Sequence, residues 1–502
     1  MRLALIAHTV GLVLRYFGLI PILPLVVDFL YGDWQESIGF AVAGFGASLA
    51  GEIMRRLHRG GADLSRVEGL AVVAAVWLVV AVFGAIPYVW SGLGALDSLF
   101  ESMSGFTTTG ATIIQDFGFF SRGIFFWRSL TQWLGGLGVI ALFIAVLPKL
   151  AIAGRQLFFA EAPGPAEERL TPRIRQTAIA LWTLYAALTL LQILLLAATG
   201  LPLYDAVCNS LATLSAGGFS PHPASIAGYA SPAAEWIIIL FMFLAGTNFS
   251  LQYYVLKGSP RNLLRDEEFR AYVIIVLVAT LLLSLALYQL TLGTRAAYLN
   301  AETSPQPLSQ ASSLTSLRHA LFQVLSILTS TGFASDDFNL WNDQAKMILL
   351  LLMFIGGSAG SAAGGPKIVR ALLIVKHAFA ELFKAVHPQA VKPVRLNNRV
   401  VSMEIMRSIT AFLLLYLLVF AVSVLVIAAF GLDIITAITA SIATLGNIGP
   451  GFGTIGPMAN FGDLHPVVKA VLIFNMWIGR LEIMTVLVLL QPHVWKTARA
   501  GD

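Results

Sequence analysis

Apolar stretches long enough to cross a bilayer occur about ten times along this chain, since a transmembrane helix needs roughly 20 residues. Only 12% of the 502 residues are charged and 57% are hydrophobic, whereas soluble domains carry about 25% charged residues. So few charges cannot make a water-solvated surface, and the sequence predicts an all-α polytopic membrane protein. The predicted spans are Leu3–Leu30, Ile38–Gly51, Gly69–Ile86, Leu130–Leu147, Ala178–Ala198, Trp236–Leu256, Ala271–Leu292, an interrupted one over Ala345–Phe383, Ile409–Phe430 and Val467–Leu490.

The basic residues indicate how these spans are oriented. With Arg2 in the cytoplasm, the cytoplasmic segments hold 23 of the 32 Lys and Arg residues, the outer segments hold six and the spans hold three. Basic residues resist translocation, so both termini are predicted to be cytoplasmic. The first apolar run is longer than the ~7–15 residues of a secretory signal, which predicts an uncleaved helix. The outer six are Arg122, Arg128, Arg295, Arg318, Lys346 and Lys469.

Four outer connections share an unusual composition. Each contains a short helix-like stretch that runs into a cluster of Ser, Thr and Gly, and the cluster glycines recur at intervals of 108, 114 and 117 residues. A single cluster is compatible with an ordinary turn, but four in phase on one side indicate a structural repeat. The clusters are Phe106–Thr112, Leu214–Ser220, Leu328–Ala334 and Leu445–Gly451, aligned on Gly110, Gly218, Gly332 and Gly449.

Two further markers keep the same phase. A pair of mostly small residues follows each glycine by 25 to 31 residues, and a polar residue precedes each glycine by 13. The polar residue is predicted to lie where the short helix begins and to cap it. The pairs are Gly135-Gly136, Ala245-Gly246, Gly356-Gly357 and Gly479-Arg480. The polar residues are Asp97, Asp205, His319 and Thr436.

One repeat is therefore a span, a short re-entrant helix, a glycine loop and a second span. Irregular backbone at membrane depth occurs only where protein or a water-filled cavity surrounds it, so the four loops are predicted to surround one pseudo-fourfold pore. Two extra N-terminal transmembrane helices precede the repeats. The predicted divisions are residues 1–60 for these helices and 61–160, 161–262, 263–392 and 393–502 for repeats 1 to 4.

A pore of this kind suits a monovalent cation. A cation entering the membrane exchanges its hydration shell for other oxygens, and rings of backbone carbonyls do this in potassium channels. Glycine reaches the dihedrals that aim a carbonyl inward without a Cβ penalty, and the short helices direct their partially negative C-terminal ends to the same place. Polar side chains beside the glycines, such as Thr108, Thr331 and Asn447, offer further oxygens.

Together these features resemble the Trk/Ktr/HKT superfamily of potassium transporters, and most closely its bacterial TrkH branch. The resemblance rests on the two extra N-terminal spans, the four glycine loops, the GGSAGSAAGGPK segment at Gly356–Lys367 and the closing WIGRLEIMTVL at Trp477–Leu487. It implies K⁺ uptake across the bacterial inner membrane, with Rb⁺ also accepted, lipid as the surroundings and no covalently bound cofactor. Plant relatives with serine in the first loop favour Na⁺, so Gly110 implies K⁺.

In that family the loop glycines line a short ion filter. Here the register of the second loop is open between Gly217 and Gly218, and the fourth loop departs from the Ser/Thr-Gly-Phe pattern. One glycine per loop predicts fewer ion sites, and weaker discrimination between K⁺ and Rb⁺, than a full channel filter gives. The filter residues implied by the resemblance are Thr108, Thr109, Gly110, Gly217, Gly218, Thr331, Gly332, Ile448 and Gly449.

Two features are candidates for a gate. The glycine-dense segment Gly356–Gly365 is a poor helix former, and it is interpreted either as an irregular loop across the pore or as a small-residue packing face. Arg480 replaces a glycine of the other repeats; a charge at membrane depth faces a cavity or a partner, so it is either a barrier in the pore or an ion pair with Glu482 or Glu404. The gate residues implied by the resemblance are Gly356, Gly357, Gly360, Gly364, Gly365, Lys367, Arg480 and Glu482.

The remaining inferences concern partners and rival functions. The resemblance implies a homodimer and a cytosolic nucleotide-binding regulatory subunit like TrkA, for which the basic segment Lys367–Arg399 offers a surface, although inner loops are basic for topological reasons alone. Na⁺ permeation and transport coupled to H⁺ or Na⁺, as in a symporter, stay open. No nucleic-acid ligand is predicted, and no enzyme either, because no nucleophile, base or metal set converges and no Walker lysine motif occurs.

Overall fold

The computed structural model describes residues 1–57, 64–145, 170–299 and 313–489. Within them the chain is almost entirely helical, and its one sheet is a hairpin of β1 (Arg395–Leu396) and β2 (Arg399–Val400). The prediction of an all-α fold is confirmed. The predicted divisions at residues 60–61 and 160–161 lie outside the described residues, as do part of the second basic inner segment and the C-terminal tail from residue 490.

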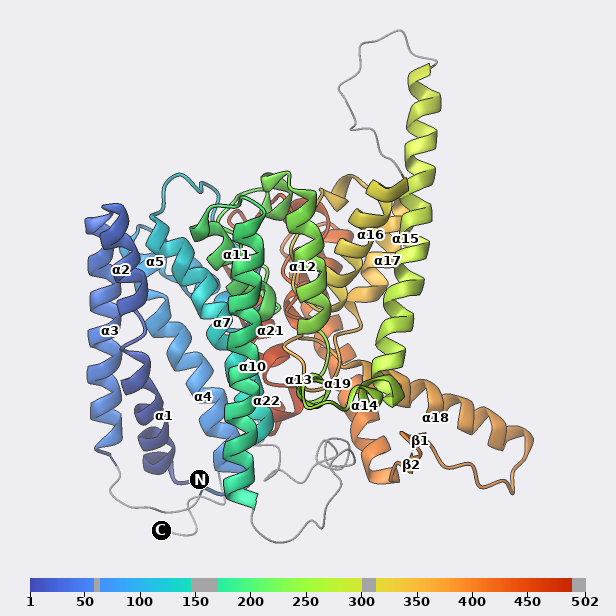
Figure 1. The fold of residues 1–502 in the computed structure, drawn as a ribbon. Helices are drawn as coiled ribbons and strands as arrows, with labels where there is room; N and C mark the ends of the chain where they lie inside the picture. The colour runs from blue at the N-terminus through green and yellow to red at the C-terminus, as the bar shows by residue number, and fades with distance from the viewer. Residues whose placement is uncertain (58–63, 146–169, 300–312, 490–502) are drawn as a thin grey trace.

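Three N-terminal helices form one flank of the molecule (Figure 1). α1 (Leu3–Phe17) and α2 (Ile22–Tyr31) together make a 29-residue apolar candidate span, and α3 (Trp34–Arg55) packs beside them. A Cβ added at Gly11 would lie within 3.0 Å of the α3 backbone, so glycine permits this close packing. Asp28 of α2 accepts a hydrogen bond from the backbone N–H of Gly123 at 2.7 Å, which ties this flank to the rest of the chain.

Four sets of helices follow in the same order, each with a long helix, a short helix, a loop and a second long or broken helix. The long first helices are α4 (Arg66–Gly84), α10 (Leu170–Ala198), α15 (Glu267–Leu299) and α19 (Met403–Ala429). The short helices are α6 (Ala95–Phe106), α11 (Leu203–Leu214), α16 (Ser313–Leu328) and α20 (Ile434–Leu445). The second helices are α7 (Arg122–Ala145), α12 (Pro232–Ala245) with α13 (Phe249–Leu256), α17 (Asp343–Met353) with α18 (Ile368–Val386), and α21 (Pro466–Arg480) with α22 (Ile483–Leu489).

Several predicted boundaries differ from the structure. Six described helices are long and apolar enough to cross a membrane, and two more candidates are bent pairs. The continuous spans predicted over Trp236–Leu256 and Val467–Leu490 are wrong: α12 and α13 meet at 103°, and α21 and α22 at 110°. At the first bend the side chain of Asn248 caps the new helix by accepting from Ser250 N at 2.8 Å, and at the second Glu482 has a φ of +60°. Each bend therefore starts a new helix instead of continuing the old one.

The short helices also begin differently from the prediction. Asp97 and Asp205 lie in first turns but are not N-cap residues, because Gly94 and Pro202 hold those positions without a side-chain bond. His319 lies within α16, whose first residue is Ser313. The fourth helix has a side-chain cap of this type, but it is supplied by Asp433, which accepts from Thr436 N at 3.0 Å. A capping role for the four predicted residues is therefore wrong.

Apolar and polar side chains separate as lipid surroundings require. Large apolar residues such as Phe45, Leu281 and Leu425 are 61% to 72% exposed on the flanks of long helices, where no water-soluble surface would tolerate them in such number. Buried Ser, Thr, Asn and Gln residues gather instead on the short helices and the loops after them. The polar interior of the protein thus lies where the four loops meet.

Candidate functional site

The four short helices end in the same backbone motif. In each loop, the residue just before the aligned glycine donates its N–H to the carbonyl oxygen five residues earlier. The residue two before the glycine donates its N–H to the carbonyl oxygen three residues earlier. This pair of bonds is the Schellman motif. The first set of bonds is Thr109 N to Ser104 O (2.8 Å), Gly217 N to Ala212 O (2.9 Å), Thr331 N to Ser326 O (2.8 Å) and Ile448 N to Ala443 O (2.7 Å). Four different sequences therefore make one geometry.

Backbone dihedrals repeat just as closely. The residue two before each glycine is left-handed although it is not glycine, with φ between 52° and 55°: Thr108, Ala216, Ser330 and Asn447. The aligned glycines are also at positive φ: Gly110 (82°), Gly218 (78°), Gly332 (79°) and Gly449 (101°). Gly217 is not among the residues at positive φ, so Gly218 is the structural equivalent of Gly110. The open register of the second loop is thereby settled as a matter of structure.

The four glycines lie in a closed ring. A Cβ added at any one of them would come within 3.0 Å of the carbonyl oxygen of the residue before the next glycine. Gly110 faces Gly217 O, Gly218 faces Thr331 O, Gly332 faces Ile448 O, and Gly449 faces Thr109 O. The order runs through the loops in sequence and returns to the first, so the loops surround one axis. No acidic side chain belongs to this ring.

Hydrogen bonds between side chains stabilise the first, third and fourth loops. In the first loop the hydroxyls of Thr107 and Thr109 are 2.8 Å apart, and in the third loop those of Thr329 and Thr331 are 2.7 Å apart. Asn447 of the fourth loop donates from Nδ2 to Thr109 Oγ1 at 3.0 Å. Of the side chains that the sequence had suggested as ion ligands, Thr331 uses its hydroxyl and Asn447 its amide nitrogen in these bonds, whereas Thr108 Oγ1 and Asn447 Oδ1 have no hydrogen-bond partner among the described residues. The bonds of Thr331 and Asn447 are supporting ones.

The second loop is held differently, by Gln132 of α7. The Gln132 Nε2 donates to Gly217 O at 2.6 Å, and its Oε1 accepts from Phe219 N at 3.0 Å. Gln132 is fully buried. Sequence reasoning missed this residue, because a glutamine inside an apolar span carries no motif that distinguishes it from a packed polar side chain.

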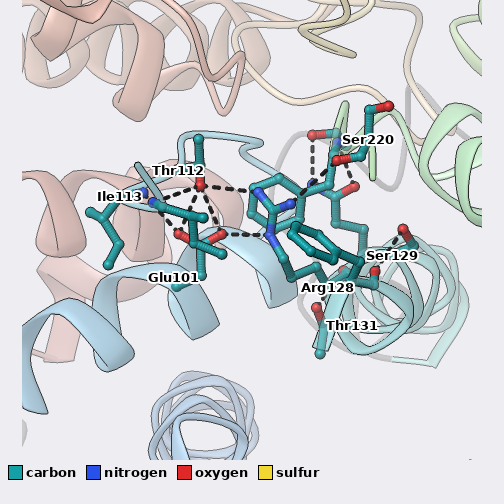
Figure 2. Close-up of polar contacts among 12 residues, drawn as sticks. Glu101, Thr112, Ile113, Arg128, Ser129, Thr131 and Ser220 are labelled. Atoms are coloured by element: carbon teal, nitrogen blue, oxygen red, sulfur yellow. Dashed lines mark hydrogen bonds and ion pairs between the residues drawn. The ribbon is translucent and has the colours of Figure 1, made fainter. Parts of the chain in front are cut away.

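A buried ion pair lies beside the first two loops. Arg128 of α7 donates from Nε to Glu101 Oε1 at 2.7 Å, and their side chains are 2% and 0% exposed. Glu101 also accepts from Ile113 N at 2.9 Å, and Arg128 reaches Ser220 O at 3.3 Å. Figure 2 shows the guanidinium between Glu101 and Thr112 on one side and Ser220 on the other. Arg128 was predicted to lie in an outer segment; it is inside α7, which begins eight residues before the predicted span.

An open pocket lies on one side of the ring. All four loops contribute to its lining, through Gly110, Gly218, Gly332 and Pro450. Arg128, whose charge is already paired with Glu101, is the only Lys or Arg residue among the lining residues. The pocket therefore gives access to the ring without an unpaired positive charge at its entrance.

The glycine-dense segment of the third repeat is an irregular loop, as one of the two interpretations predicted. It runs from the end of α17 to the start of α18. Its backbone bonds to the second repeat, where Ser358 N donates to Gly246 O at 2.9 Å. The Gly364 N–H donates to Ser330 Oγ at 2.5 Å, and a Cβ at Gly364 would collide with Gly446 O. This intramembrane loop therefore lies directly against the third and fourth ring loops.

Glu268 of α15 links the middle of the intramembrane loop to the first turn of α18. Its Oε1 accepts from Ala359 N at 2.7 Å and from Val369 N at 3.1 Å. The Lys367 ammonium donates to Ala363 O within the same loop. Both charged side chains are buried. Sequence reasoning named Lys367 but missed Glu268, which lies in a different helix almost 100 residues earlier.

Arg480 reaches the intramembrane loop from the fourth repeat. Its Nη1 donates to Ala362 O at 3.1 Å and its Nη2 to Gly135 O at 3.3 Å. The ion pair considered with Glu482 is not the one in the structure, because Glu482 pairs with Arg370 at 2.7 Å. Among its described hydrogen bonds, the buried Arg480 contacts only carbonyls, so no carboxylate pairs with it there. The structure thus joins Gly356, Gly357, Gly360, Gly364, Gly365, Lys367 and Arg480 in one assembly, with Glu482 at its margin.

Known proteins resemble this chain in both sequence and structure. Residues 47–496 match the TrkH family, described as cation transport protein. The Trk system potassium uptake protein TrkH of Salmonella typhimurium is 38% identical over 504 residues, covering 99% of this chain and all of that protein. The protein of the same name from Escherichia coli K12 is 37% identical with the same coverage. The crystal structure of the potassium transporter TrkH from Vibrio parahaemolyticus has a TM-score of 0.87 at 33% identity, covering 99% of this chain and all of that one.

These relatives match the whole chain, not a part of it. The family comprises transport proteins and not enzymes, which agrees with the prediction made from the residues. Its members and the apolar helices described above identify a multi-pass membrane protein. The chain therefore belongs to the TrkH family of cation transport proteins.

Proposed function

We propose that this protein takes up K⁺ across the bacterial inner membrane through the ring of four glycine loops. The observation that carries the proposal is the closed order in which each glycine faces the carbonyl preceding the next glycine. Relatives named as potassium uptake proteins match the full chain. In this proposal K⁺ and Rb⁺ pass through the ring, which is formed by Thr108, Thr109, Gly110, Gly217, Gly218, Thr331, Gly332, Ile448 and Gly449.

The chemistry of the ring follows from what surrounds an ion there. Carbonyl oxygens replace water around the ion. Four helix C-termini direct partial negative charge at the same point, so a cation is stabilised without an acidic side chain that would bind it too tightly to leave. Because one glycine per loop gives a short ring, we expect weaker discrimination between K⁺ and Rb⁺ than in a channel with several stacked carbonyl rings.

The intramembrane loop and Arg480 form the gate in this proposal. The loop packs against the third and fourth ring loops, and Arg480 bonds to its Ala362 carbonyl. A positive charge beneath the ring repels a cation leaving it, so conduction requires Arg480 and the loop to move aside. Gly356, Gly357, Gly360, Gly364 and Gly365 let the loop pack this closely, and Lys367 fastens its end.

The proposal extends to partners and orientation. Both termini are cytoplasmic, the active form is a homodimer, and a cytosolic nucleotide-binding subunit similar to TrkA controls the gate. The basic segment Lys367–Arg399, which includes α18 and the β1–β2 hairpin, is its docking surface. In Figure 1 this segment extends away from the helices around the ring, which leaves it accessible to a partner.

Growth of a bacterium that lacks its own K⁺ uptake systems tests the proposal directly. The expected result is growth at low external K⁺ when this chain is expressed. The matched control is Gly110→Ser, since a side chain there collides with Gly217 O; it should abolish growth or shift transport towards Na⁺. Purified protein in liposomes that passes neither K⁺ nor Rb⁺, with or without a regulatory subunit, would contradict the proposal. A flux that requires a gradient of H⁺ or Na⁺ would establish coupled transport instead.

A further inference from the structure

Helix α7 of the first repeat contacts the second glycine loop on both sides of Gly218. Gln132 and Arg128 lie four residues apart and so on the same face of α7. The Gln132 amide bonds to Gly217 O at 2.6 Å and to Phe219 N at 3.0 Å. Arg128 bonds to Ser220 O, and its guanidinium carbon lies 4.0 Å from the centroid of the Phe219 ring. Residues 217–220 of this loop are therefore held in position by one neighbouring helix, α7.

Gln132 occupies the space that a side chain fills in the other loops. The residues that correspond to Gly217 are Thr109, Thr331 and Ile448. A Cβ added at Gly217 would lie within 3.0 Å of the Cβ, Cδ and Oε1 atoms of Gln132. The second loop thus has glycine at this position because the glutamine has taken its place, which also explains why the sequence shows two adjacent glycines in this loop only.

The hydrogen bonds of the second loop differ from those of the first and third at the same position. Thr107 donates its hydroxyl proton to Met103 O at 2.6 Å, so Thr109 must be the donor in the pair of hydroxyls. In the third loop Thr329 donates to Leu325 O, and Thr331 plays the part of Thr109. In the second loop Ser215 donates to Leu211 O in the same way, but Gly217 has no hydroxyl to continue the pattern. Gln132 bonds instead to the loop backbone, at Gly217 O and Phe219 N.

The bonded carbonyl is one of the four in the ring. Gly217 O lies against Gly110 on one side and receives the Gln132 amide on the other. The position of α7 is itself fixed by the buried pair of Arg128 and Glu101 (Figure 2). A carbonyl whose direction is set by a fully buried amide cannot turn freely to follow an ion of different radius.

We propose that Gln132 is a specificity-determining residue, which positions the Gly217 carbonyl and so sets how well the ring distinguishes K⁺ from Na⁺. The inference rests on the proposed function of the ring. It goes further by assigning ion discrimination to a side chain behind the ring, and by treating Gln132 in the second loop as the replacement for the threonine hydroxyls of the first and third.

The decisive experiment compares single and double variants in liposomes, with K⁺, Rb⁺ and Na⁺ flux measured at several concentrations. Gln132→Ala frees the carbonyl and leaves a cavity, so we expect the K⁺ to Na⁺ flux ratio to fall about tenfold and the half-saturating K⁺ concentration to rise, with a smaller change in maximal flux. Gln132→Glu keeps the length and the acceptor but loses the donor to Gly217 O, and it should lower the ratio as well.

The second substitution tests the exchange itself. Gly217→Thr alone collides with Gln132 and should abolish transport. In the double variant Gln132→Ala with Gly217→Thr, the introduced hydroxyl has room and can donate to Ser215 Oγ, as Thr109 does to Thr107. We expect the double variant to regain most of the K⁺ to Na⁺ ratio.

Gln192 provides the matched control. It is also a fully buried glutamine, and it donates to Thr213 Oγ1 at 3.0 Å on the short helix of the same loop, but it does not contact the loop in any described bond. Gln192→Ala should lower the yield of folded protein without changing the ion ratio. An unchanged ratio in both Gln132 variants, or a double variant that recovers protein yield but not the ratio, overturns the inference. A wild-type protein that passes no K⁺ would instead contradict the proposed function.

Discussion

The four repeats are alike in the ring of glycine loops and unlike in the layer beneath it, which consists of the intramembrane loop, Arg480 and the corresponding residues of the other repeats. In the ring, four segments with different side chains adopt the same dihedrals and the same backbone hydrogen bonds. In the layer beneath, the four repeats differ at corresponding positions: Gly136 lies within the unbroken helix α7, Gly246 ends a helix at a bend, Gly357 lies in the intramembrane loop, and Arg480 carries a charge.

This difference teaches which features a single chain must repeat and which it can vary. An ion at the axis is coordinated from all sides, so each loop has to present the same backbone. A gate needs only one segment to block the axis and one group to hold it there. In the gate proposed above, the third and fourth repeats supply these parts, and the first two repeats provide surfaces that contact them.

Gly218→Ala tests the rule of equal backbone in the ring and should have the largest effect. A methyl group there meets Thr331 O well inside van der Waals distance, and φ is +78°. We expect K⁺ uptake to fall about 100-fold, since overpacking and strain together cost about 3 kcal/mol. Uptake in the deficient bacterium measures it, with protein amount determined in parallel.

The control for this variant separates strain from collision. Gly200 in the same repeat has a φ of +92°, and a Cβ there would meet nothing within 4 Å. Gly200→Ala should therefore lower stability slightly and leave uptake unchanged. Equal losses in the two variants would show that backbone strain, and not contact with the next carbonyl, disables the ring.

Arg480→Ala tests the layer beneath the ring. It removes the charge and both bonds to Ala362 O and Gly135 O, so we expect basal K⁺ flux without a regulatory subunit to rise about tenfold, the change that loss of ~1.4 kcal/mol of barrier would give. Liposome flux measures it. Arg407 is the control, because it is an exposed arginine on α19, and Arg407→Ala should leave flux as it was. Unchanged or lower flux in a stably folded Arg480→Ala variant would remove Arg480 from the gate.

The two regions also differ in how far the sequence predicted them. The ring glycines could be aligned from their spacing alone, because a left-handed dihedral combined with the close approach of the next carbonyl selects for glycine in every repeat. Only the second loop was ambiguous, and the reason is Gln132, which comes from a different helix and has no counterpart in the other loops. Gln132 packs against the second loop only, so this loop has two adjacent glycines where the other loops have one, and the spacing alone could not decide between them.

The layer beneath offered fewer regularities. The intramembrane loop was predicted from its glycines and Arg480 from its cost in lipid, but the partners of both lie in other repeats. Glu268 bonds to Ala359 and Val369 across 91 and 101 residues of sequence, and nothing in the local pattern marks it. The bends after α12 and α21 were missed for a related reason, because the apolar residues on either side outweigh the few polar residues at each break, such as Asn248 and Glu482.

Glu268→Ala should have a smaller effect than Arg480→Ala and in the same direction. It removes the acceptor that links the middle of the intramembrane loop to the start of α18, so the loop leaves its closed position more often. Loss of two buried bonds of this kind predicts a rise in basal flux of about threefold to tenfold. Glu268→Gln is the control, since its Oε1 can still accept both N–H groups. If basal flux rose equally in Glu268→Ala and Glu268→Gln, the charge of Glu268, and not its two hydrogen bonds, would be what holds the loop closed.

The smallest effect should come from Ala216→Gly, which returns to the ring. Ala216 is held at a φ of +55°, where a non-glycine residue is strained by about 1–2 kcal/mol. Glycine relieves part of this strain, but it also increases the conformational entropy of the unfolded chain, which lowers stability by about 0.4–1 kcal/mol. We expect a gain near 0.5 kcal/mol in the free energy of unfolding, seen as a small rise in melting temperature, with the K⁺ to Na⁺ ratio unchanged because the backbone stays where it is. Ala212→Gly, four residues earlier in the helix interior, should do the reverse and destabilise by about 0.5–1 kcal/mol. Opposite signs for the same substitution would show that the motif ending the short helix, not the residue that occupies it, defines the ring.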